Sequence, residues 1–226
     1  MEIKEDEIQN AMKKMKQGKA PGPDGITLEL IIEGAEIIVQ HLRTVFTQCL
    51  KLGRVPKSWK HGQIILIHKK GDKEDIRNYR PISLLSTTYK IFTKILCNRM
   101  KITLDENQPR EQAGFRRNYS TTDHLHTINQ LVEKTTEHQI PLCLCFIDFE
   151  KAFDTIATSK MLETLEEQGI EKCYVNILRD FYTDGTSEIR TEIGQMHRII
   201  KIERGVRQGY TISPNLFTAA LEGVFR

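Results

Sequence analysis

Apolar residues recur every three or four positions along several parts of this chain, which is the spacing of helices that bury one face. In the first of them, Ile8 and Met12 share a face among charged residues, and Gly18 is expected to end the helix. Thr122 or Asp123 is expected to cap a later one. The pattern predicts helices over residues 5–17, 26–52, 84–104, 122–137, 159–168, 172–182 and from Ser213 to the final residue.

Shorter apolar or alternating runs predict strands. Residues 63–68 have the apolar sequence of one strand, and residues 142–147 form a second that is followed directly by Asp148. Residues 187–190 alternate between polar and apolar side chains, and residues 199–202 are expected to return beside them. The dipeptide Asp184-Gly185, just before, is a hairpin signal. Helices and strands mixed in this order indicate an α+β fold.

The composition restricts the class of protein. A chain of 226 residues can form one or two domains, and its net charge of +3 favours nucleic acid weakly, so the positions of the basic residues matter more than their sum. The five cysteines are scattered without a CxxC pair, which is typical of a reducing, intracellular compartment, and Cys143 and Cys145 are expected to pack in the core. No apolar stretch approaches the roughly 18 residues that span a bilayer, so we expect a soluble protein without membrane contact.

Asp148 ends the apolar strand that starts at Leu142, and a carboxylate in that place is suited to holding a divalent metal. Five residues further on, Phe153 adds a flat aromatic wall. Together they suit a site that binds a nucleotide and distinguishes its sugar by size. Each residue also has a plainer interpretation, because a strand-terminal Asp is often a turn or cap residue and Phe153 can be a core aromatic.

Basic residues gather around the charged turn that follows residues 63–68. Lys contributes a point charge and Arg a bidentate fork, so such a group can converge on a polyphosphate. Acidic residues are interleaved with the basic ones, which makes an ordinary solvated turn the alternative. The basic residues are Lys69, Lys70, Arg77 and Arg80, and the acidic ones are Asp72, Glu74 and Asp75.

A third candidate is the loop of residues 204–214. Its two glycines, Gly205 and Gly209, allow the backbone to approach a ligand closely, while Gln208 and Tyr210 offer an amide and an aromatic surface. Ser213-Pro214 then opens a helix. A glycine-containing loop before a helix is common, so a purely structural turn is the alternative here as well.

Taken together, the motifs resemble those of the reverse transcriptases of non-LTR retrotransposons, of the LINE type and RTE-like. The resemblance covers nearly the whole chain and implies a right-hand polymerase with fingers and a partial palm, whose palm sheet has antiparallel strands and flanking helices. It divides the chain into a helical extension with the start of the fingers (1–60), fingers (61–138) and partial palm (139–226). Five ordered segments carry it: residues 18–25, 78–85, 112–116, 146–154 and 207–209.

Roles for single residues follow from the same resemblance. Asp148 is similar to the first metal-binding aspartate of the palm, with the Phe149 carbonyl as a further ligand for Mg²⁺ or Mn²⁺. Phe153 resembles the steric gate that excludes ribonucleotides. The residues that would hold the incoming nucleotide are Lys70, Arg80, Phe153, Gln208 and Gly209, and those that would contact nucleic acid are Lys69, Arg116 and Arg117.

The implied function is RNA-directed DNA synthesis by two-metal nucleotidyl transfer, with template RNA, a DNA primer and dNTPs as partners, in the cytoplasm or nucleus. Such transfer uses two divalent ions about 3.5–4 Å apart. The family's other metal carboxylates come from a paired-Asp hairpin, and no Asp-Asp pair occurs in these 226 residues. The sequence is therefore expected to be truncated before that hairpin and to be inactive alone. Tyr210 departs from the family, which commonly carries Asp there.

Two further expectations concern partners. The last predicted helix has an apolar stripe that includes Phe217, Leu221 and Val224, and we expect its exposure to cause self-association. The alternative to a polymerase is a non-catalytic RNA- or DNA-binding remnant that uses the same basic residues. A third class, a protein-interaction module, would not need those charges.

Overall fold

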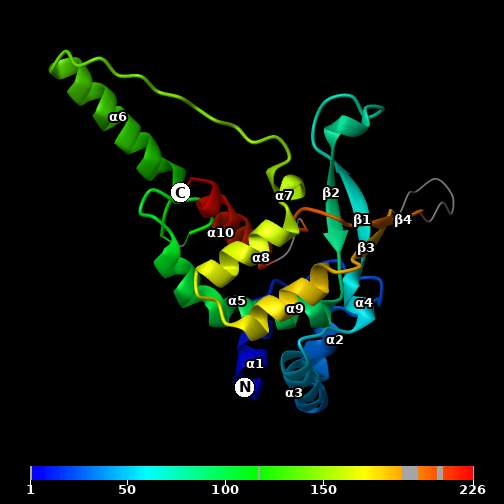
Figure 1. Ribbon diagram of the computed structural model, residues 1–226. Coiled ribbons are helices and arrows are strands. Elements are labelled where there is room, and N and C mark those ends of the chain that lie inside the picture. The colour runs from blue at the N-terminus through cyan, green and yellow to red at the C-terminus, as the bar shows by residue number, and fades with distance from the viewer. Residues whose placement is uncertain (1, 117, 190–197, 208–210, 226) are drawn as a thin grey trace.

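A computed structural model describes residues 2–116, 118–189, 198–207 and 211–225 of the chain. The elements are α1 (Glu5–Lys13), α2 (Leu28–Glu33), α3 (Ala35–Leu52), α4 (Lys57–Lys60), β1 (His61–His68), η1 (Ile76–Asn78), β2 (Tyr79–Leu84), α5 (Thr87–Asn107), α6 (Thr121–Glu137), α7 (Ala152–Thr155), α8 (Thr158–Glu167), α9 (Lys172–Tyr182), β3 (Thr186–Ile189), β4 (Arg198–Lys201) and α10 (Ser213–Phe225). Helices and strands occur in separate runs along the chain, with β1 and β2 between two groups of helices and β3 and β4 before the last helix, in agreement with the α+β expectation (Figure 1).

Within the described residues, the four strands form one sheet in the order β2-β1-β3-β4. The pairs β1–β2 and β3–β4 are antiparallel, whereas β1 and β3 are parallel. The expected antiparallel sheet therefore holds for two of the three pairs. The predicted return of residues 199–202 is confirmed by the pairing of Ser187 with Ile200. The turn at Asp184-Gly185, however, joins α9 to β3 and not two strands.

The strand β2 is an addition to the predicted elements, and Pro81 lies within it although proline donates no hydrogen bond to a ladder. Proline is tolerated here because β2 is an edge strand of the sheet, paired on one side with β1. Pro81 lies opposite Leu66 in the register of that pair.

The predicted helices are all present, with local corrections. The helix expected over residues 26–52 is divided at Gly34, which separates α2 from α3. The cap of α6 is Ser120 and not Thr122 or Asp123, because the Asp123 carboxylate accepts hydrogen bonds from the backbone and hydroxyl of Ser120 at 2.8 and 3.0 Å. α1 ends at Lys13, before Gly18.

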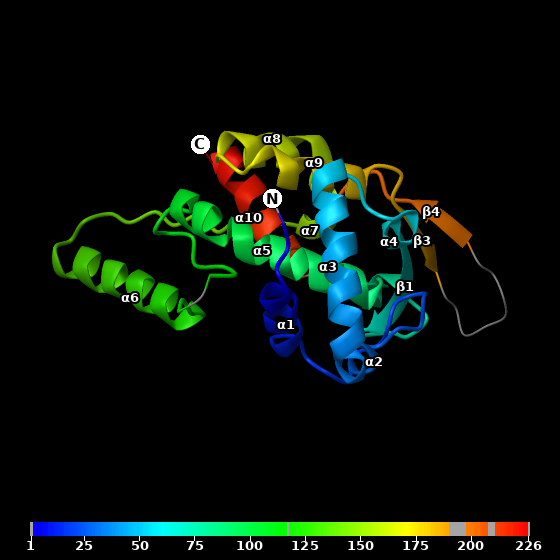
Figure 2. The ribbon, with the colours of Figure 1, turned by 90° about the horizontal axis from the view of Figure 1, so that it is seen from below.

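The core lies where α5 crosses α3, α4 and α9 (Figure 2). An aromatic cluster fills its centre, with Phe92 of α5 between Phe46 and Trp59 at ring distances of 5.0 and 5.6 Å. Tyr89 stacks on Phe181 of α9 at 4.3 Å. This packing holds α9 and β3 in place beside β1.

Residues 141–149 are the largest departure from the sequence prediction. The expected strand over residues 142–147 is wrong for this structure: the segment is extended, without strand pairing, and its side chains are exposed. Figures 1 and 2 both show α6 and this segment standing apart from the other helices. Cys143 and Cys145 are accordingly exposed, which corrects the expectation that they pack in the core. An apolar run needs a neighbouring strand before it can be buried as part of a sheet, and none of the described strands pairs with it.

No helix in the described part of the chain is both long and apolar enough to cross a membrane.

Candidate nucleotide and nucleic-acid site

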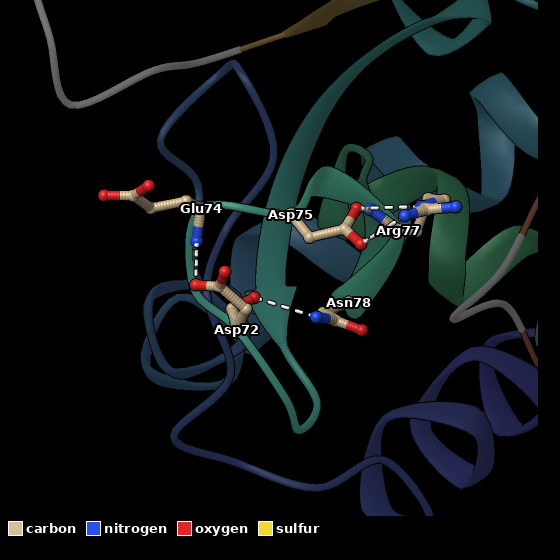
Figure 3. A network of polar contacts seen from close by, with 5 residues as sticks. All are labelled: Asp72, Glu74, Asp75, Arg77 and Asn78. Atoms are coloured by element: carbon tan, nitrogen blue, oxygen red, sulfur yellow. Dashed lines mark hydrogen bonds and ion pairs between the residues drawn. The ribbon is translucent and has the colours of Figure 1, made fainter.

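The turn between β1 and β2 is held together by its own polar groups (Figure 3). The Lys69 N–H donates to the carbonyl of Asn78 at 2.8 Å, and the Asn78 side-chain nitrogen donates to the carbonyl of Asp72 at 2.8 Å. Gly71 takes a positive φ of 88°, which a side chain would strain. The loop therefore has a defined shape at the end of the hairpin.

Arg77 is engaged within this turn. Its guanidinium donates to both carboxylate oxygens of Asp75, with the shortest contact at 2.8 Å (Figure 3). The hydrogen bond from the Arg77 side chain lowers the pKa of the Asp75 carboxyl, and the same bond raises the pKa of Arg77. One of the four basic residues of the predicted phosphate cluster thus has a partner in the loop, as the solvated-turn alternative proposed.

The other three basic residues, Lys69, Lys70 and Arg80, are exposed around the same hairpin end. Arg80 lies opposite Ile67 in the β1–β2 register. Neither lysine forms an ion pair with an acidic side chain of the described residues. Their charges are therefore available to an anion.

Phe153 lies in α7 and belongs to an aromatic triad. Its ring stacks on Phe217 of α10, with the centroids 4.7 Å apart and an interplanar angle of 20°. Phe115, from the loop before α6, meets Phe153 edge-on at 5.8 Å. The sequence placed Phe115 and Phe217 in separate motifs and gave no signal that they meet. The ring of Phe153 is half-buried, in agreement with its interpretation as a packed aromatic.

Asp148 lies four residues before α7, in the exposed extended segment. Lys151, which precedes α7, adopts the left-handed conformation at φ 50° and turns the chain into the helix. Phe149, next to Asp148, lines an apolar cavity of about 330 Å³ together with Phe217 and Leu221 of α10. The carboxylate is thus attached to a backbone that leads directly into the aromatic triad.

Residues 204–207 pack against α7 through the backbone. The Val206 N–H donates to the carbonyl of Phe153, and the Gly205 N–H to that of Ile156, each at 2.7 Å. A Cβ on Gly205 would lie 2.8 Å from the Cα of Asp154. The backbone at Gly205 thus closely approaches the chain itself, as the structural-turn alternative proposed, and the predicted approach to a ligand stays a prediction. Asp154 and Gly205 both line a cavity of about 180 Å³.

Arg207 belongs to one of the segments that carry the family resemblance, but its side chain is packed in the interior, which the sequence did not predict. It is 5% exposed, lies over the Phe181 ring at 4.7 Å, and donates from Nη2 to the carbonyl of Lys60 at 2.8 Å. The Ser213 hydroxyl donates to its carbonyl at 2.8 Å. The predicted residues Gln208 and Gly209, and Tyr210 beside them, lie outside the described residues.

Arg116 is turned back onto its own loop. Its Nη1 donates to the carbonyls of Pro109 and Gln112 at 2.8 and 3.3 Å, and its guanidinium lies 4.9 Å from the Tyr119 ring centroid. These contacts shape the loop that presents Phe115. Arg117, the second predicted contact, lies outside the described residues.

The structure thus brings several of the motifs together around α7. The loop of Phe115, the helix of Phe153 and residues 204–207 meet there, and Pro81 and Ser83 of β2 line the same 180 Å³ cavity as Asp154. Asp148 has no described contact with the basic hairpin end of Lys70 and Arg80.

A sequence model of the family described as "Reverse transcriptase (RNA-dependent DNA polymerase)" matches residues 67–226, which include β2, the aromatic triad and residues 204–209. The chain belongs to the reverse transcriptase family. The predicted resemblance is thereby confirmed.

Relatives place it among non-LTR retrotransposon proteins. This reverse transcriptase is 32% identical over 97% of its length to the "Retrovirus-related Pol polyprotein from type-1 retrotransposable element R2" of Popillia japonica, covering 30% of that protein. It is 30% identical over 94% of its length to the "RNA-directed DNA polymerase from mobile element jockey" of Drosophila melanogaster, covering 23%. With the "Transposon TX1 uncharacterized 149 kDa protein" of Xenopus laevis it shares 30% identity over 96% of its length, covering 16%. The chain therefore spans less than a third of these relatives.

A solved structure supports the polymerase fold. Apo telomerase from Candida tropicalis, truncated from its C-terminal domain, aligns with 88% of this reverse transcriptase and 44% of its own chain, with a TM-score of 0.50 and 14% sequence identity. At that identity the likeness concerns the fold.

Reverse transcriptases generally use divalent metals, and the donor set described here does not make a complete two-metal site. No group of three or more His, Cys, Asp or Glu side chains comes close enough to hold an ion among the described residues. Asp148 and the Phe149 carbonyl can offer two oxygen ligands. Two dications need further carboxylates.

Proposed function

We propose that this chain binds template RNA, a DNA primer and an incoming dNTP as the fingers and partial palm of an RNA-directed DNA polymerase of a non-LTR retrotransposon. The observation that supports this most is that the reverse transcriptase match covers residues 67–226, a range in which three exposed basic residues gather at one hairpin end. The proposed divisions are 1–60, 61–138 and 139–226. The proposed location is inside the cell, in the cytoplasm or nucleus.

Within this proposal, the exposed hairpin end meets phosphate groups. Lys70 and Arg80 would hold the triphosphate of the dNTP, Lys70 as a point charge and Arg80 as a planar fork. Lys69, next to them, would contact nucleic acid, as would Arg116 and Arg117. Because Arg77 is paired with Asp75, we leave it out of the phosphate site.

The nucleotide's sugar and base would lie on the α7 side. Phe153 would limit the space at the 2′ position, with its ring held by stacking on Phe217. Gln208 and Gly209 would lie against the new base pair. Asp148 and the Phe149 carbonyl would be this chain's ligands for Mg²⁺ or Mn²⁺, which neutralises phosphate charge when bound.

A binding assay tests the proposal. The probe is an RNA template annealed to a DNA primer, and the variant is Lys69→Gln/Lys70→Gln/Arg80→Gln. We expect the affinity of the wild type to fall as the salt concentration rises. The slope of log K against log salt should be less steep in the variant, because each lost phosphate contact reduces its magnitude by about 0.7–0.9. A matched control is Arg43→Gln/Lys134→Gln/Arg179→Gln, whose residues are exposed and paired with glutamates elsewhere. Equal slopes in the two triple variants would contradict the proposal.

A non-catalytic nucleic-acid-binding function is the second candidate, and the missing cluster of metal-binding side chains in the described residues favours it. Incorporation assays separate the two. Binding without nucleotide incorporation in Mg²⁺ or Mn²⁺ supports the binding function for this chain alone. Incorporation that disappears in Asp148→Asn supports the polymerase.

A further inference from the structure

A lysine-lined cleft adjoins the site described above. It has a volume of about 440 Å³ and is bounded by α5, by the residues that follow α1, and by β2. α1 packs beside α5, and the residues that follow α1 line the cleft together with residues of α5 (Figure 2 shows the two helices). We call it the lysine cleft. Its lysines are Lys14, Lys16 and Lys19 from the N-terminal side and Lys90 and Lys94 from α5.

The charge of the lysine cleft is poorly compensated. No acidic side chain is among the described residues that line it, and none of its five lysines forms an ion pair with a described carboxylate. Burial lowers the pKa of Lys90, and the acidic group that counters this is Asp24, through its charge. Ammonium groups gathered without carboxylates repel one another, and a polyanion relieves that repulsion.

The lining also limits what the anion can be. None of the described residues that line the lysine cleft is aromatic, so these residues offer charge and no surface for base stacking. Its remaining walls are apolar, with Met15 and Leu28 near the N-terminal side and Ile82 on β2. Such a surface suits the backbone of a nucleic acid and does not read its sequence.

The lysine cleft is continuous with the proposed nucleotide site along β2. Ser83 of β2 lines both the lysine cleft and the 180 Å³ cavity that Asp154 and Gly205 also line. An RNA strand bound at the proposed site can therefore continue into the lysine cleft.

We propose that the lysine cleft binds backbone phosphates of the single-stranded template RNA that has not yet been copied. This inference rests on the proposed function, because it needs an RNA template. It adds a site on α5 and the N-terminal residues that lies outside the hairpin end and outside α7.

The test measures binding of the whole chain to a fluorescently labelled single-stranded RNA over a range of salt concentrations. The variants are Lys90→Gln/Lys94→Gln and Lys14→Gln/Lys16→Gln/Lys19→Gln. Each phosphate contact on a single strand contributes about 0.7 to the magnitude of the slope of log K against log salt. This magnitude should therefore decrease by roughly 1.4 in the double variant and roughly 2.1 in the triple variant. Circular dichroism and thermal unfolding identify any variant that fails to fold, and the other variant then carries the test.

The matched control is Lys51→Gln/Lys101→Gln. Both residues are exposed, Lys101 is on α5, and each faces an acidic residue, Glu2 at 3.8 Å and Asp105 at 4.0 Å. This double variant removes the same charge as the α5 variant, so we expect its slope to be that of the wild type. A slope reduced as much as in the α5 variant would mean that net charge alone matters, and would overturn the inference.

Two further arms separate the alternatives. In the first, tripolyphosphate is titrated alone into the wild type and the cleft variants. If the cleft variants lose tripolyphosphate binding but bind RNA as the wild type does, the cleft is a site for free phosphate, and the inference is overturned. The triple variant of Lys69, Lys70 and Arg80 is measured with the primer–template. If that variant has the wild-type slope and the cleft variants do not, the proposed function fails while the cleft stands as an RNA site.

Discussion

The ring of Phe153 stacks on the ring of Phe217, with the centroids 4.7 Å apart and the planes inclined by 20°. Phe153 comes from α7 and Phe217 from α10, 64 positions later in the sequence. Through this pair, the helix after Asp148 is fixed against the helix after residues 204–210. The proposed role of Phe153 in excluding a 2′ hydroxyl requires a rigid side chain, and the stack on Phe217 restrains its ring.

The stack predicts an energetic coupling. Phe153→Leu and Phe217→Leu should each lower the free energy of unfolding, and their double variant should reveal a coupling of about 0.5–1.5 kcal/mol, the usual value for aromatic pairs. Urea unfolding of the wild type, both single variants and the double variant measures it. Additive effects would mean that the two rings do not act together.

The steric-gate role proposed for Phe153 can be measured separately. In Phe153→Val, a complementary ribonucleotide should stabilise the complex with primer–template nearly as well as the deoxynucleotide does, because the smaller side chain leaves room for the 2′ hydroxyl. Phe115→Leu is the control, since it removes another ring of the triad. If both variants keep wild-type discrimination, Phe153 is a packing residue and not a gate.

Gly205 should not tolerate a side chain. Its φ is +86°, and a Cβ would lie 2.8 Å from the Cα of Asp154, so Gly205→Ala should destabilise the protein by more than about 2 kcal/mol. Gly169→Ala is the matched control, with φ +81° and no atom within 4 Å of the added Cβ. It should cost only about 1 kcal/mol. Thermal unfolding compares the two, and equal losses would contradict the close contact between Gly205 and α7.

Cysteine reactivity tests the extended segment. Cys143 and Cys145 are exposed, whereas Cys49 is buried and burial raises its pKa to about 11. Alkylation under native conditions, followed by mass spectrometry, should modify the first two rapidly and Cys49 slowly, because the thiolate is the reactive form. Protection of Cys143 and Cys145 would show that residues 141–149 are covered, as the sequence alone predicted.

The ion pair between Glu7 of α1 and Arg99 of α5 predicts a dependence on pH. Two contacts of 2.7 Å join the side chains, and the Arg99 hydrogen bond lowers the pKa of Glu7 from its usual 4.5. A carboxyl group whose pKa is lower in the folded state than in the unfolded state stabilises the fold at pH values above its unfolded-state pKa. That stabilisation is lost as the pH falls through the folded-state pKa. Glu7→Gln should cost about 1–2 kcal/mol near pH 7. Near pH 3 the difference from the wild type should be smaller, as urea unfolding at both pH values would show. An equal loss at both would contradict this.

The helices were predictable because their burial follows from local periodicity. Ile91, Phe92, Ile95 and Leu96, which carry the pattern of α5, are all buried. Their spacing indicates that the helix buries one face, and it does so whichever element packs against that face. The division at Gly34 and the cap at Ser120 depend on single residues, which periodicity does not resolve.

The strands were less predictable because a strand is stable only with a neighbour. Residues 142–147 have the composition of a buried strand, yet no described strand pairs with them. β2 contains Pro81 and was missed, although it pairs along its whole length with β1. Pairing depends on residues far away in the sequence, and so does the burial of Arg207 against Phe181.

The candidate site was predictable as a set of motifs and less so as a geometry. Lys69, Lys70 and Arg80 are exposed, which both the phosphate-binding interpretation and the solvated-turn alternative allow, whereas Arg77 is bound by Asp75. Arg116 is held by its own loop. The lysine cleft had no signal in the sequence, because its lysines come from two segments more than 70 positions apart, the nearest two being Lys19 and Lys90.

Template-directed nucleotide binding tests the central claim most directly. A complex of this chain with an RNA template and a 3′-blocked DNA primer is measured in Mg²⁺ with each of the four dNTPs in turn. The account predicts that the dNTP complementary to the template base slows dissociation of the complex, by about tenfold for each 1.4 kcal/mol of added binding energy. It also predicts that Lys70→Ala and Arg80→Ala abolish this effect. Equal dissociation rates with all four dNTPs, or a slowing that both variants retain, would contradict it.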